Sequence, residues 1–268
     1  MLKNKVIIIT GASSGIGKAC ALEFFKSGAR LMLAARNETK LIELNSLINN
    51  SGGECNYMVT DVSVELDCQN MINQTIAIYG SIDVLINNAG ISMRALFLDL
   101  DLKAFDKVMK VNFYGTIYCT KHALPHLLKN KGSVVGVSSI AGHKGLPART
   151  AYSASKFAMT GFLESLRIEN LKKGLHVLIA SPGFTSSSIR ENALSASGEN
   201  QKESPRNEKK MMTPELVAKK IVFAVKYRKN SIILTFQGKL LVFLNKFFPT
   251  LVDKLVFNTL SKEKKSPF

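Results

Sequence analysis

The chain has few cysteines and no visible internal repeat. Its four cysteines, Cys20, Cys55, Cys68 and Cys119, are scattered over 268 residues without C-x-x-C spacing. This scatter argues against a disulfide framework or a structural zinc site and favours a reducing compartment. His122 and His126 are four residues apart, but no third ligand lies nearby, so we interpret them as a surface or partly buried pair and expect no bound metal.

Long apolar runs are also scarce. Between Gly238 and Phe257 the longest uninterrupted apolar run is Leu240 to Leu244, whereas a membrane-spanning helix needs about 20 apolar residues. The first expected strand begins near residue 5, which leaves no room for a signal peptide before it. We therefore expect a cytoplasmic protein without a spanning helix.

Acidic residues are under-represented, with 20 Asp and Glu against 36 Lys and Arg, a formal charge of +16. The excess is concentrated between Arg206 and Phe268, which hold 14 of the basic and 4 of the acidic residues. No nucleic-acid-binding motif accompanies this charge, and the basic residues alternate with apolar ones. We therefore expect no nucleic-acid partner.

The basic C-terminal region instead carries an apolar stripe at helical spacing, flanked by Lys239, Lys246 and Lys254. This pattern fits a helix lying in the interface of a membrane, which would place the protein peripherally on a bilayer. It fits equally a helix docked on its own chain or on a dimer partner. Both interpretations stay open.

Most of the chain alternates short β-branched runs with amphipathic helical patterns, which predicts an α/β fold with a parallel sheet and right-handed crossovers. The length suits a single domain of this class. Strands are expected near residues 5–10, 29–35, 54–59, 83–87, 132–138, 175–180 and 231–235. Helices are expected near 15–27, 37–50, 65–79, 101–128 (broken near 110), 151–173 and 214–228.

A glycine-rich turn follows the first expected strand. Val6–Thr10 runs directly into Gly11-Ala-Ser-Ser-Gly15-Ile-Gly17, and a helical pattern begins at Ile16. Backbone N–H groups in such a turn and the dipole of the following helix attract a phosphate, and glycines let the backbone approach it closely. The alternative is a tight connection without a ligand.

Tyr152 and Lys156 are four residues apart in an expected helix, so their side chains lie on one face, one turn from each other. An ammonium in that position favours the phenolate and should lower the pKa of Tyr152 from its ordinary value near 10. The pair could then act as a general acid or base near neutrality. Taken alone, it could equally belong to a solvated helix.

Further polar residues follow two later strands. Asn87 to Gly90 come after the expected strand 83–87, and Ser138 and Ser139 come after 132–138. Open α/β sheets bind ligands at the carboxyl ends of their strands, so both groups are candidates for one site.

The chain resembles the short-chain dehydrogenase/reductase family over about residues 5 to 235. The resemblance implies a single-domain, Rossmann-type, doubly wound, parallel seven-stranded sheet with helices on both faces. The motifs that carry it occur in order and at family spacing: Thr10 to Gly17, Asp61-Val62, Asn87 to Gly90, Asn112, Ser139, Tyr152-x-x-x-Lys156 and Pro182-Gly183.

The resemblance implies a role for each of four candidate catalytic residues. Tyr152 would be the acid in carbonyl reduction and the base in alcohol oxidation, and Lys156 would tune it and bind the nicotinamide ribose. Ser139 would polarise the substrate carbonyl, and Asn112 would anchor a water that relays protons to Lys156. Hydroxyl donors suit the negative charge that hydride transfer leaves on oxygen. Ser138 could be only a strand-end cap.

The resemblance also implies the nucleotide-binding residues. Asp61 would bind the adenine amine, unless it is a helix N-cap. The family threonine after Pro-Gly matches Ser187 best, with Thr185 and Ser186 as competitors. The full set is Gly11, Ser13, Ser14, Gly15, Ile16, Gly17, Arg36, Asp61, Val62, Asn88, Ala89, Gly90, Tyr152, Lys156, Pro182, Gly183 and Ser187.

The end of the second strand distinguishes the two nicotinamide cofactors. NAD-dependent enzymes place an acidic residue there for the ribose 2′-hydroxyl, but this chain has Ala35 followed by Arg36. A guanidinium without a carboxylate suits a 2′-phosphate, so we predict NADP(H). A solvated helix-capping arginine is the alternative.

We expect a catalytic domain at residues 1–237 and an apolar, basic C-terminal extension at 238–268. Residues 184–212, rich in polar residues, are expected to form a lid over the substrate, with a slack insertion as the alternative. The resemblance also implies a homodimer or homotetramer formed through the helices at 101–128 and 151–173.

The leading hypothesis is an NADPH-dependent reductase of a hydrophobic ketone. The segments from Leu33 to Leu41 and from Ala151 to Ala158 resemble 3-ketodihydrosphingosine reductases and membrane-associated hydroxysteroid-dehydrogenase-like members. Alternatives are a 3-oxoacyl-carrier-protein reductase and a non-catalytic NADP-binding regulator.

Overall fold

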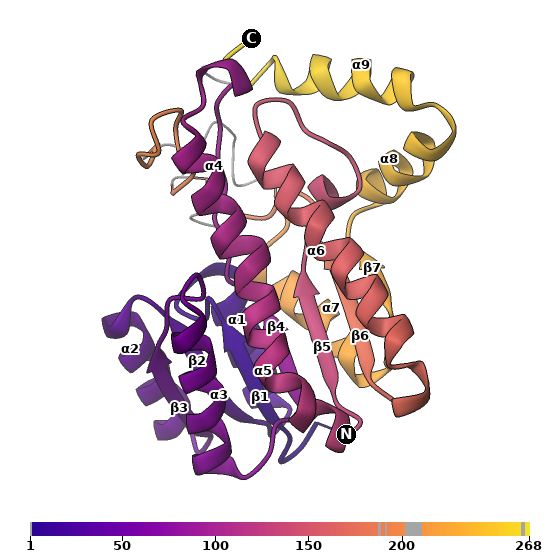
Figure 1. The fold of residues 1–268 in the computed structure, drawn as a ribbon. Coiled ribbons are helices and arrows are strands. Elements are labelled where there is room, and N and C mark those ends of the chain that lie inside the picture. Colours follow the sequence, from indigo (N-terminus) through magenta and orange to yellow (C-terminus); the bar gives the residue numbers. More distant parts are fainter. Residues whose placement is uncertain (1, 187–188, 191, 202–210, 264–265) are drawn as a thin grey trace.

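All seven expected strands form one parallel sheet. The computed structural model describes residues 2–186, 189–190, 192–201, 211–263 and 266–268 (Figure 1). The strand order is β3-β2-β1-β4-β5-β6-β7, and every pair is parallel. This doubly wound Rossmann-type sheet confirms the predicted fold class. The strands are β1 Val6–Thr10, β2 Arg30–Ala35, β3 Glu54–Val59, β4 Val84–Asn87, β5 Ser133–Val137, β6 His176–Ser181 and β7 Ser231–Ile233.

Helices cover both faces of the sheet because successive strand residues point to opposite sides. Ile7 and Ile9 of β1 belong to one hydrophobic core, whereas Val6 and Ile8 belong to the other. The first core includes α1 Gly15–Lys26, α2 Glu38–Asn50 and α7 Pro214–Lys226. The second includes α3 Glu65–Tyr79, α5 Gly115–Lys129 and α6 Thr150–Glu169.

The helix expected at 101–128 is interrupted where the sequence predicted a break. α4 Leu102–Met109 and α5 are joined by η2, a π-helical turn at Lys110–Tyr114. Single π turns within α-helices often mark functional positions, and this one contains the candidate Asn112. Further short turns in the described part of the chain are η1 Phe97–Asp99, η3 Ile140–Gly142 and η4 Leu171–Lys173.

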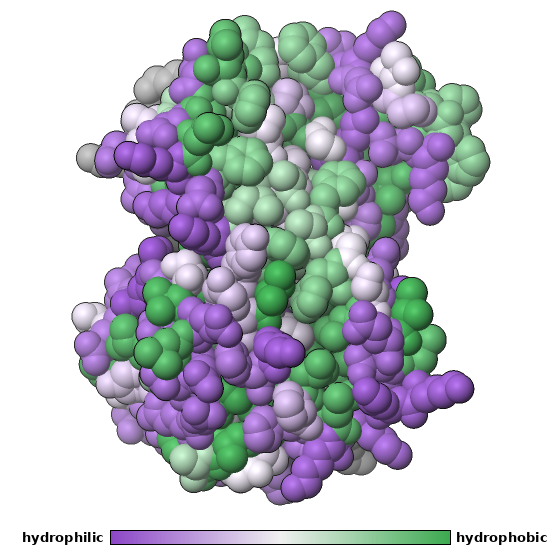
Figure 2. Space-filling view, in the orientation of Figure 1, coloured by the Kyte–Doolittle hydropathy of each residue, from purple (hydrophilic) through white to green (hydrophobic). Residues whose placement is uncertain are grey.

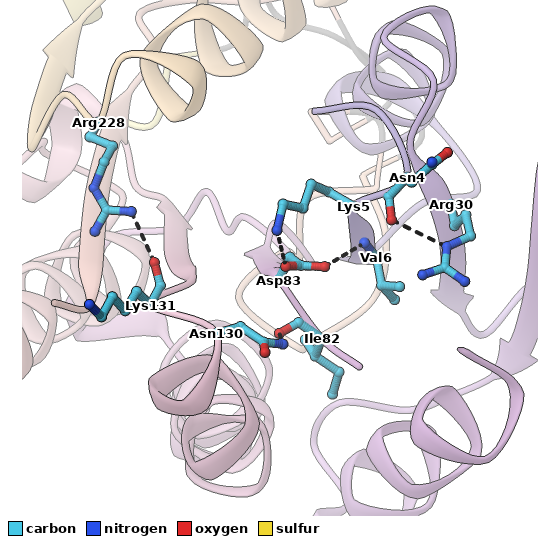
Figure 3. A network of polar contacts seen from close by, with 9 residues as sticks. All are labelled: Asn4, Lys5, Val6, Arg30, Ile82, Asp83, Asn130, Lys131 and Arg228. Atoms are coloured by element: carbon cyan, nitrogen blue, oxygen red, sulfur yellow. Dashed lines mark hydrogen bonds and ion pairs between the residues drawn. The ribbon is translucent and has the colours of Figure 1, made fainter. Parts of the chain in front are cut away.

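Polar contacts stabilise the edge of the sheet at which the parallel strands begin (Figure 3). Asp83 accepts bonds from the Lys5 ammonium at 2.8 Å and from the Val6 amide at 2.9 Å. Nearby, the Asn130 side chain donates to the carbonyl of Ile82 at 2.8 Å. The last two bonds satisfy backbone groups at the start of β1 and just before β4, at the edge opposite the candidate site.

The C-terminal extension forms two helices, α8 Phe236–Phe247 and α9 Pro249–Leu260. In Figure 1, α9 crosses above the start of α6. One face of α9 is docked on its own chain, with Val252, Val256 and Leu260 buried and Leu146 packed against them. Among the described residues, no helix combines the length and the apolar character needed to cross a bilayer.

Candidate active site

The site lies where the strand order reverses. From β1 the chain winds outward through β2 and β3, then returns to β4 on the other side of β1. The turns after β1 and β4 meet there: a Cβ added to Gly11 would lie 2.8 Å from Ala89 Cα. A cavity of about 1310 Å³ opens at this edge. It exceeds the roughly 300–1,000 Å³ of a typical single-ligand pocket, so it has room for a dinucleotide beside a substrate.

The glycine loop has the conformation that an anion site requires. Gly11 and Gly15 adopt φ of 65° and 51°, in the left-handed region that favours glycine. A Cβ at Gly17 would lie 2.2 Å from the carbonyl oxygen of Gly11, so only glycine allows α1 to approach the loop this closely. Ser13, Ser14 and Ile16 line the cavity with this loop. The cradle therefore fits a nucleotide phosphate at the N-terminus of α1.

Thr10, which the sequence analysis named only as the first residue of the glycine-loop motif and gave no role, holds the two turns together. Its buried Oγ1 donates to the Ile86 carbonyl at 3.2 Å and accepts from the amides of Asn88 and Ala89 at 3.0 and 3.1 Å. The Asn88 side chain donates in turn to the carbonyls of Thr10 and Gly11 at 2.9 and 3.2 Å. The Asn88 side chain therefore shapes the loop. The role of Thr10 had one signal in the sequence, a threonine at the end of the first strand.

The cavity is cationic beyond the end of β2. Arg36, Lys40 and Lys107 all line it. The N-cap of α2 is Asn37, whose side chain accepts from the Lys40 amide at 3.0 Å, so Arg36 does not cap this helix.

Asp61 and Val62 also line this end of the cavity. Asp61 Oδ1 accepts from the Ser63 amide at 2.9 Å and from the Ser63 hydroxyl at 2.7 Å. Burial opposes ionisation of this carboxyl, but the Ser63 bonds and the charges of Arg36 and Lys107 outweigh it and lower the pKa of Asp61. The N-cap of α3 is Val64, so Asp61 is not that cap. A Cβ at Gly115 would lie 2.8 Å from Val62 Cγ2, which shows how closely the π turn packs here.

Ser139, Tyr152 and Lys156 converge at the carboxyl end of β5, and all three line the cavity. The Ser139 hydroxyl is hydrogen-bonded to Tyr152 and accepts from the Ala141 amide at 3.2 Å. Lys156 Nζ lies 5.8 Å from the centre of the Tyr152 ring and donates to the Val137 carbonyl at 2.9 Å. Ser138 instead contacts Thr160 Oγ1 at 3.2 Å within the fold and has a structural role.

The electrostatics of Tyr152 differ from the sequence expectation. Burial raises the pKa of Tyr152 above its ordinary value of 10.0, although the Ser139 bond and the charges of Arg149 and Arg190 lower it. Burial also lowers the pKa of Lys156 to about 8. The expectation that Lys156 brings Tyr152 below its usual pKa is therefore wrong for this structure, because loss of water outweighs the neighbouring charges. Near pH 7 the tyrosine is protonated and available as a proton donor.

Asn112 lies in the π turn and fastens the loop after β4. Its Oδ1 accepts from the Ile91 amide at 2.8 Å, and its Nδ2 donates to the Ile91 carbonyl and to Ser155 Oγ, both at 2.9 Å. A Cβ at Gly90 would lie 3.2 Å from Asn112 Oδ1 and 3.6 Å from Lys156 Nζ. The side chain therefore connects the Gly90 loop to α6, and its predicted role in holding a relay water stays a prediction.

The turn after β6 completes the nucleotide side of the cavity, which Pro182, Gly183 and Thr185 line. The Pro182 carbonyl accepts from the Ile140 amide at 3.1 Å, and the Thr185 hydroxyl donates to the Gly183 carbonyl at 3.2 Å. Ser187, the predicted nucleotide ligand, lies outside the described residues.

The rest of the wall comes from distant parts of the chain and combines apolar residues with charged ones, Arg149, Arg190 and Glu263 among them. Leu146 precedes α6, Leu194 follows β6, and the C-terminal helices contribute residues that, apart from Gln237, the sequence analysis placed outside the catalytic domain. These are Gln237, Gly238 and Leu241 of α8 and Leu255, Val256, Thr259 and Leu260 of α9.

The fold and the phosphate cradle define a Rossmann-type nucleotide-binding protein. The family model of the short chain dehydrogenases matches residues 5–198, and the chain belongs to this family of oxidoreductases. The resemblance inferred from the motifs is thereby confirmed.

Curated relatives agree with this assignment. The chain is 34% identical to Dehydrogenase/reductase SDR family member 7B of Mus musculus, over 99% of this chain and 84% of that protein. It is 35% identical to Dehydrogenase/reductase SDR family protein 7-like of Drosophila melanogaster, over 93% and 78%. It is 41% identical to 11-beta-hydroxysteroid dehydrogenase A of Arachis hypogaea, over 73% and 57%.

Solved structures support the fold. A short chain dehydrogenase/reductase from Burkholderia phymatum in complex with NAD superposes with a TM-score of 0.84, at 22% identity over 93% of this chain and 95% of that one. An alcohol dehydrogenase from Thermococcus sibiricus complexed with 5-hydroxy-NADP gives 0.78, at 23% identity over 87% and 96%.

Proposed function

We propose that this protein is an NADPH-dependent oxidoreductase that reduces a ketone on a hydrophobic substrate or oxidises the corresponding secondary alcohol. The observation that carries the proposal is the convergence of Ser139, Tyr152 and Lys156 between a phosphate cradle and an apolar wall. A nicotinamide nucleotide in the cradle would supply or accept the hydride.

In the reductive direction, the Tyr152 phenol donates its proton to the carbonyl oxygen, which becomes the alcohol. Ser139 donates a hydrogen bond to the same oxygen and so stabilises the developing negative charge. The mainly protonated Lys156 ammonium stabilises the tyrosinate that remains. In oxidation the same groups act in reverse, with Tyr152 as the base.

The preference for NADPH follows from the cations at the end of β2. Arg36, Lys40 and Lys107 line the cavity where the adenosine ribose would lie, and the cavity-lining residue at the end of β2 is Ala35 rather than a carboxylate. Cations in this position favour a 2′-phosphate over a 2′-hydroxyl. Asp61 lies nearby and would bind the adenine amine.

The preference for a hydrophobic substrate follows from the wall opposite the nucleotide, where Leu146, Leu194, Leu241, Leu255 and Leu260 line the cavity. We propose a long-chain 3-keto base or a steroid-like ketone as the substrate class. Residues 1–237 would form the catalytic domain, with 184–212 as its cover, and 238–268 would extend it. In support of a cover, the amide of Met212 bonds the carbonyl of Phe184 at 3.1 Å and so closes the base of this segment.

The experiment is an NADPH-oxidation assay with a detergent-dispersed long-chain 3-keto base, a steroid ketone and a short acetoacetyl thioester, each repeated with NADH. We expect turnover of at least one lipophilic ketone, with NADPH preferred. Turnover of the thioester alone would move the protein to acyl-carrier chemistry. Binding of NADPH without turnover of any ketone or alcohol would favour a regulator.

We further propose that the C-terminal helices contact an anionic membrane surface. Phe243, Phe247, Leu251 and Leu255 are each about half exposed or more, and lysines flank them. Apolar side chains bordered by cations suit the headgroup region of a bilayer. Co-sedimentation with vesicles containing phosphatidylserine should exceed that with neutral vesicles, and Phe243→Glu with Phe247→Glu should abolish the difference. Equal sedimentation with both vesicle types would contradict this contact.

A homodimer or homotetramer is the proposed assembly. Figure 2 shows an apolar band on the face formed by α5 and α6. Tyr114, which precedes α5, and Phe157 of α6 are 43% and 46% exposed. Contiguous exposed apolar surface of this kind suits an interface with a second copy of the chain. Light scattering should show an oligomer that Phe157→Glu dissociates. A monomeric wild type would contradict it.

A further inference from the structure

The C-terminal extension contacts the segment between the two proposed hydroxyl donors. We call α8, α9 and Glu263 the strap, and residues 139–152 the donor segment, because it begins at Ser139 and ends at Tyr152. Contacts follow the donor segment from one end to the other. They join Gly238 to Ile140, Asn245 to the His143 carbonyl at 3.3 Å, Asp253 to Lys144 at 2.5 Å, Leu241 and Leu244 to the cluster of Leu146, and Glu263 to Arg149 at 3.1 Å.

The contact at Glu263 is buried, unlike the ion pair at Asp253. The Glu263 side chain is 3% exposed, and its Oε2 lies 3.1 Å from Arg149 Nη2 and 3.6 Å from Arg94 Nε. Both arginine side chains are 10% exposed. Asp253 is 65% exposed. Ions removed from water interact far more strongly than exposed ones, so the strap has one strong electrostatic attachment and one weak one.

Arg149 lies close to the candidate acid in the sequence and lines the same cavity. It occupies the N-cap position of α6, three residues before Tyr152, and both residues line the cavity. Within the described part of the chain, the charges of Arg149 and Arg190 act on Tyr152 and Lys156 lies beside its ring, while Arg149 and Arg94 contact Glu263. Arg149 therefore belongs to both groups.

We propose that Glu263 is a positioning residue for Tyr152: it holds Arg149 at the start of α6 and offsets part of its positive charge. The strap thereby completes the active site from outside the Rossmann core and sets the proton affinity of the acid. The importance of this coupling for catalysis rests on the proposed role of Tyr152 as the proton donor. The coupling itself concerns only the ionisation of Tyr152, so it can be measured without a substrate.

The test is a pH titration of tyrosine absorbance in Glu263→Gln. Subtracting the same titration of the matched protein that also carries Tyr152→Phe isolates the signal of Tyr152. Without the carboxylate, the charge of Arg149 acts on Tyr152 unopposed and stabilises the phenolate, so the midpoint should move to lower pH. The control, Asp253→Asn, removes the exposed carboxylate of the same strap and should leave the midpoint at the wild-type value.

A second variant guards against misfolding, because Glu263→Gln leaves buried arginines short of a counter-ion. Arg149→Met combined with Glu263→Gln removes both members of the pair, and its Tyr152 midpoint should return toward the wild-type value. Identical midpoints in wild type and Glu263→Gln, with native circular dichroism, would overturn the proposal. Equal shifts in Glu263→Gln and the double variant would also overturn it, because Arg149 would then not be the intermediary.

This titration separates the inference from the proposed function. If Glu263→Gln shifts the midpoint and no ketone is turned over, the coupling stands and the proposed reaction fails. If a ketone is turned over and the midpoint stays fixed, the reaction stands and the coupling fails.

Discussion

Lys156 Nζ donates a hydrogen bond of 2.9 Å to the main-chain carbonyl of Val137, the last residue of β5. The bond joins α6 to the strand whose end leads into Ser139. It fixes the lysine in the lining of the cavity, where the residue is only 3% exposed and burial lowers its pKa to about 8. A lysine in this state loses its charge within the working range of an enzyme.

The pKa of Lys156 predicts a pH dependence. Because its proton dissociates as pH rises through about 8, kcat/KM for the nucleotide should fall above that pH. Lys156→Arg keeps its charge at alkaline pH, so the residual activity of this variant should lose that descending limb. Parallel profiles for the two proteins between about pH 7 and pH 10 would show that another group titrates.

Arg36→Ala should weaken NADPH binding about tenfold or more, since a charge-assisted bond to a phosphate contributes about 1.5–3 kcal/mol. NADH lacks the 2′-phosphate, so its affinity should change little. The matched control is Arg30→Ala at the other end of β2, which should alter neither affinity. Fluorescence titration with both nucleotides measures the difference, and an equal loss for NADH and NADPH would mean that Arg36 does not contact the 2′-phosphate.

Two glycine-to-alanine substitutions should have opposite effects. Gly17→Ala places a Cβ 2.2 Å from the Gly11 carbonyl oxygen, so it should deform the phosphate loop, weaken nucleotide binding and cost about 1–3 kcal/mol of stability. Gly161 lies within α6 with no atom within 4 Å of the added Cβ. Gly161→Ala should therefore stabilise the protein by about 0.5–1 kcal/mol. Urea unfolding and nucleotide titration measure both effects; two variants that behave alike would contradict the loop geometry.

His176 should make stability depend on pH. Burial is the main cause that lowers its pKa below 6.5, the Arg228 charge adds to it, and the bond to the Lys229 carbonyl opposes it. The unfolded chain binds a proton near 6.5 and the folded chain only at lower pH, so stability present above about 6.5 is lost as pH falls through the folded pKa.

Urea unfolding at several pH values between about 7.5 and 5.5 tests this expectation. In His176→Asn the decline should be shallower. It should not vanish, because burial also lowers the pKa of His143. A decline as steep as that of the wild type would exclude His176 as a source.

The features that could be predicted from the sequence are those that depend on local residue spacing. Each strand of the sheet, the glycine loop after β1 and the positions of Ser139, Tyr152 and Lys156 follow from short motifs whose residues interact within a few positions or through regular parallel pairing. The break near residue 110 was visible as well, but its π-helical form was not. Asn112 of that turn bonds Ile91 across 21 residues of chain, a contact that local spacing does not reveal.

The parts that escaped prediction are contacts between distant segments. Glu263 binds Arg149 across 114 residues, and the apolar stripe of the C-terminal helices divides between a docked face and an exposed one. Periodicity reports that a face is apolar but not what covers it. The direction in which the pKa of Tyr152 shifts was also not predicted, because the sequence shows the neighbouring lysine but not how much water the fold removes.

The most direct test of the account is the Tyr152→Phe variant, assayed with NADPH and the best lipophilic ketone. Phenylalanine keeps the ring and removes the proton, so kcat should fall by about 10²- to 10⁴-fold while the NADPH dissociation constant stays within about twofold. Tyr227→Phe, at an exposed residue that ends α7, is the matched control and should retain full activity. If Tyr152→Phe reduces the ketone as fast as the wild type, Tyr152 is not the proton donor and the proposed mechanism is wrong.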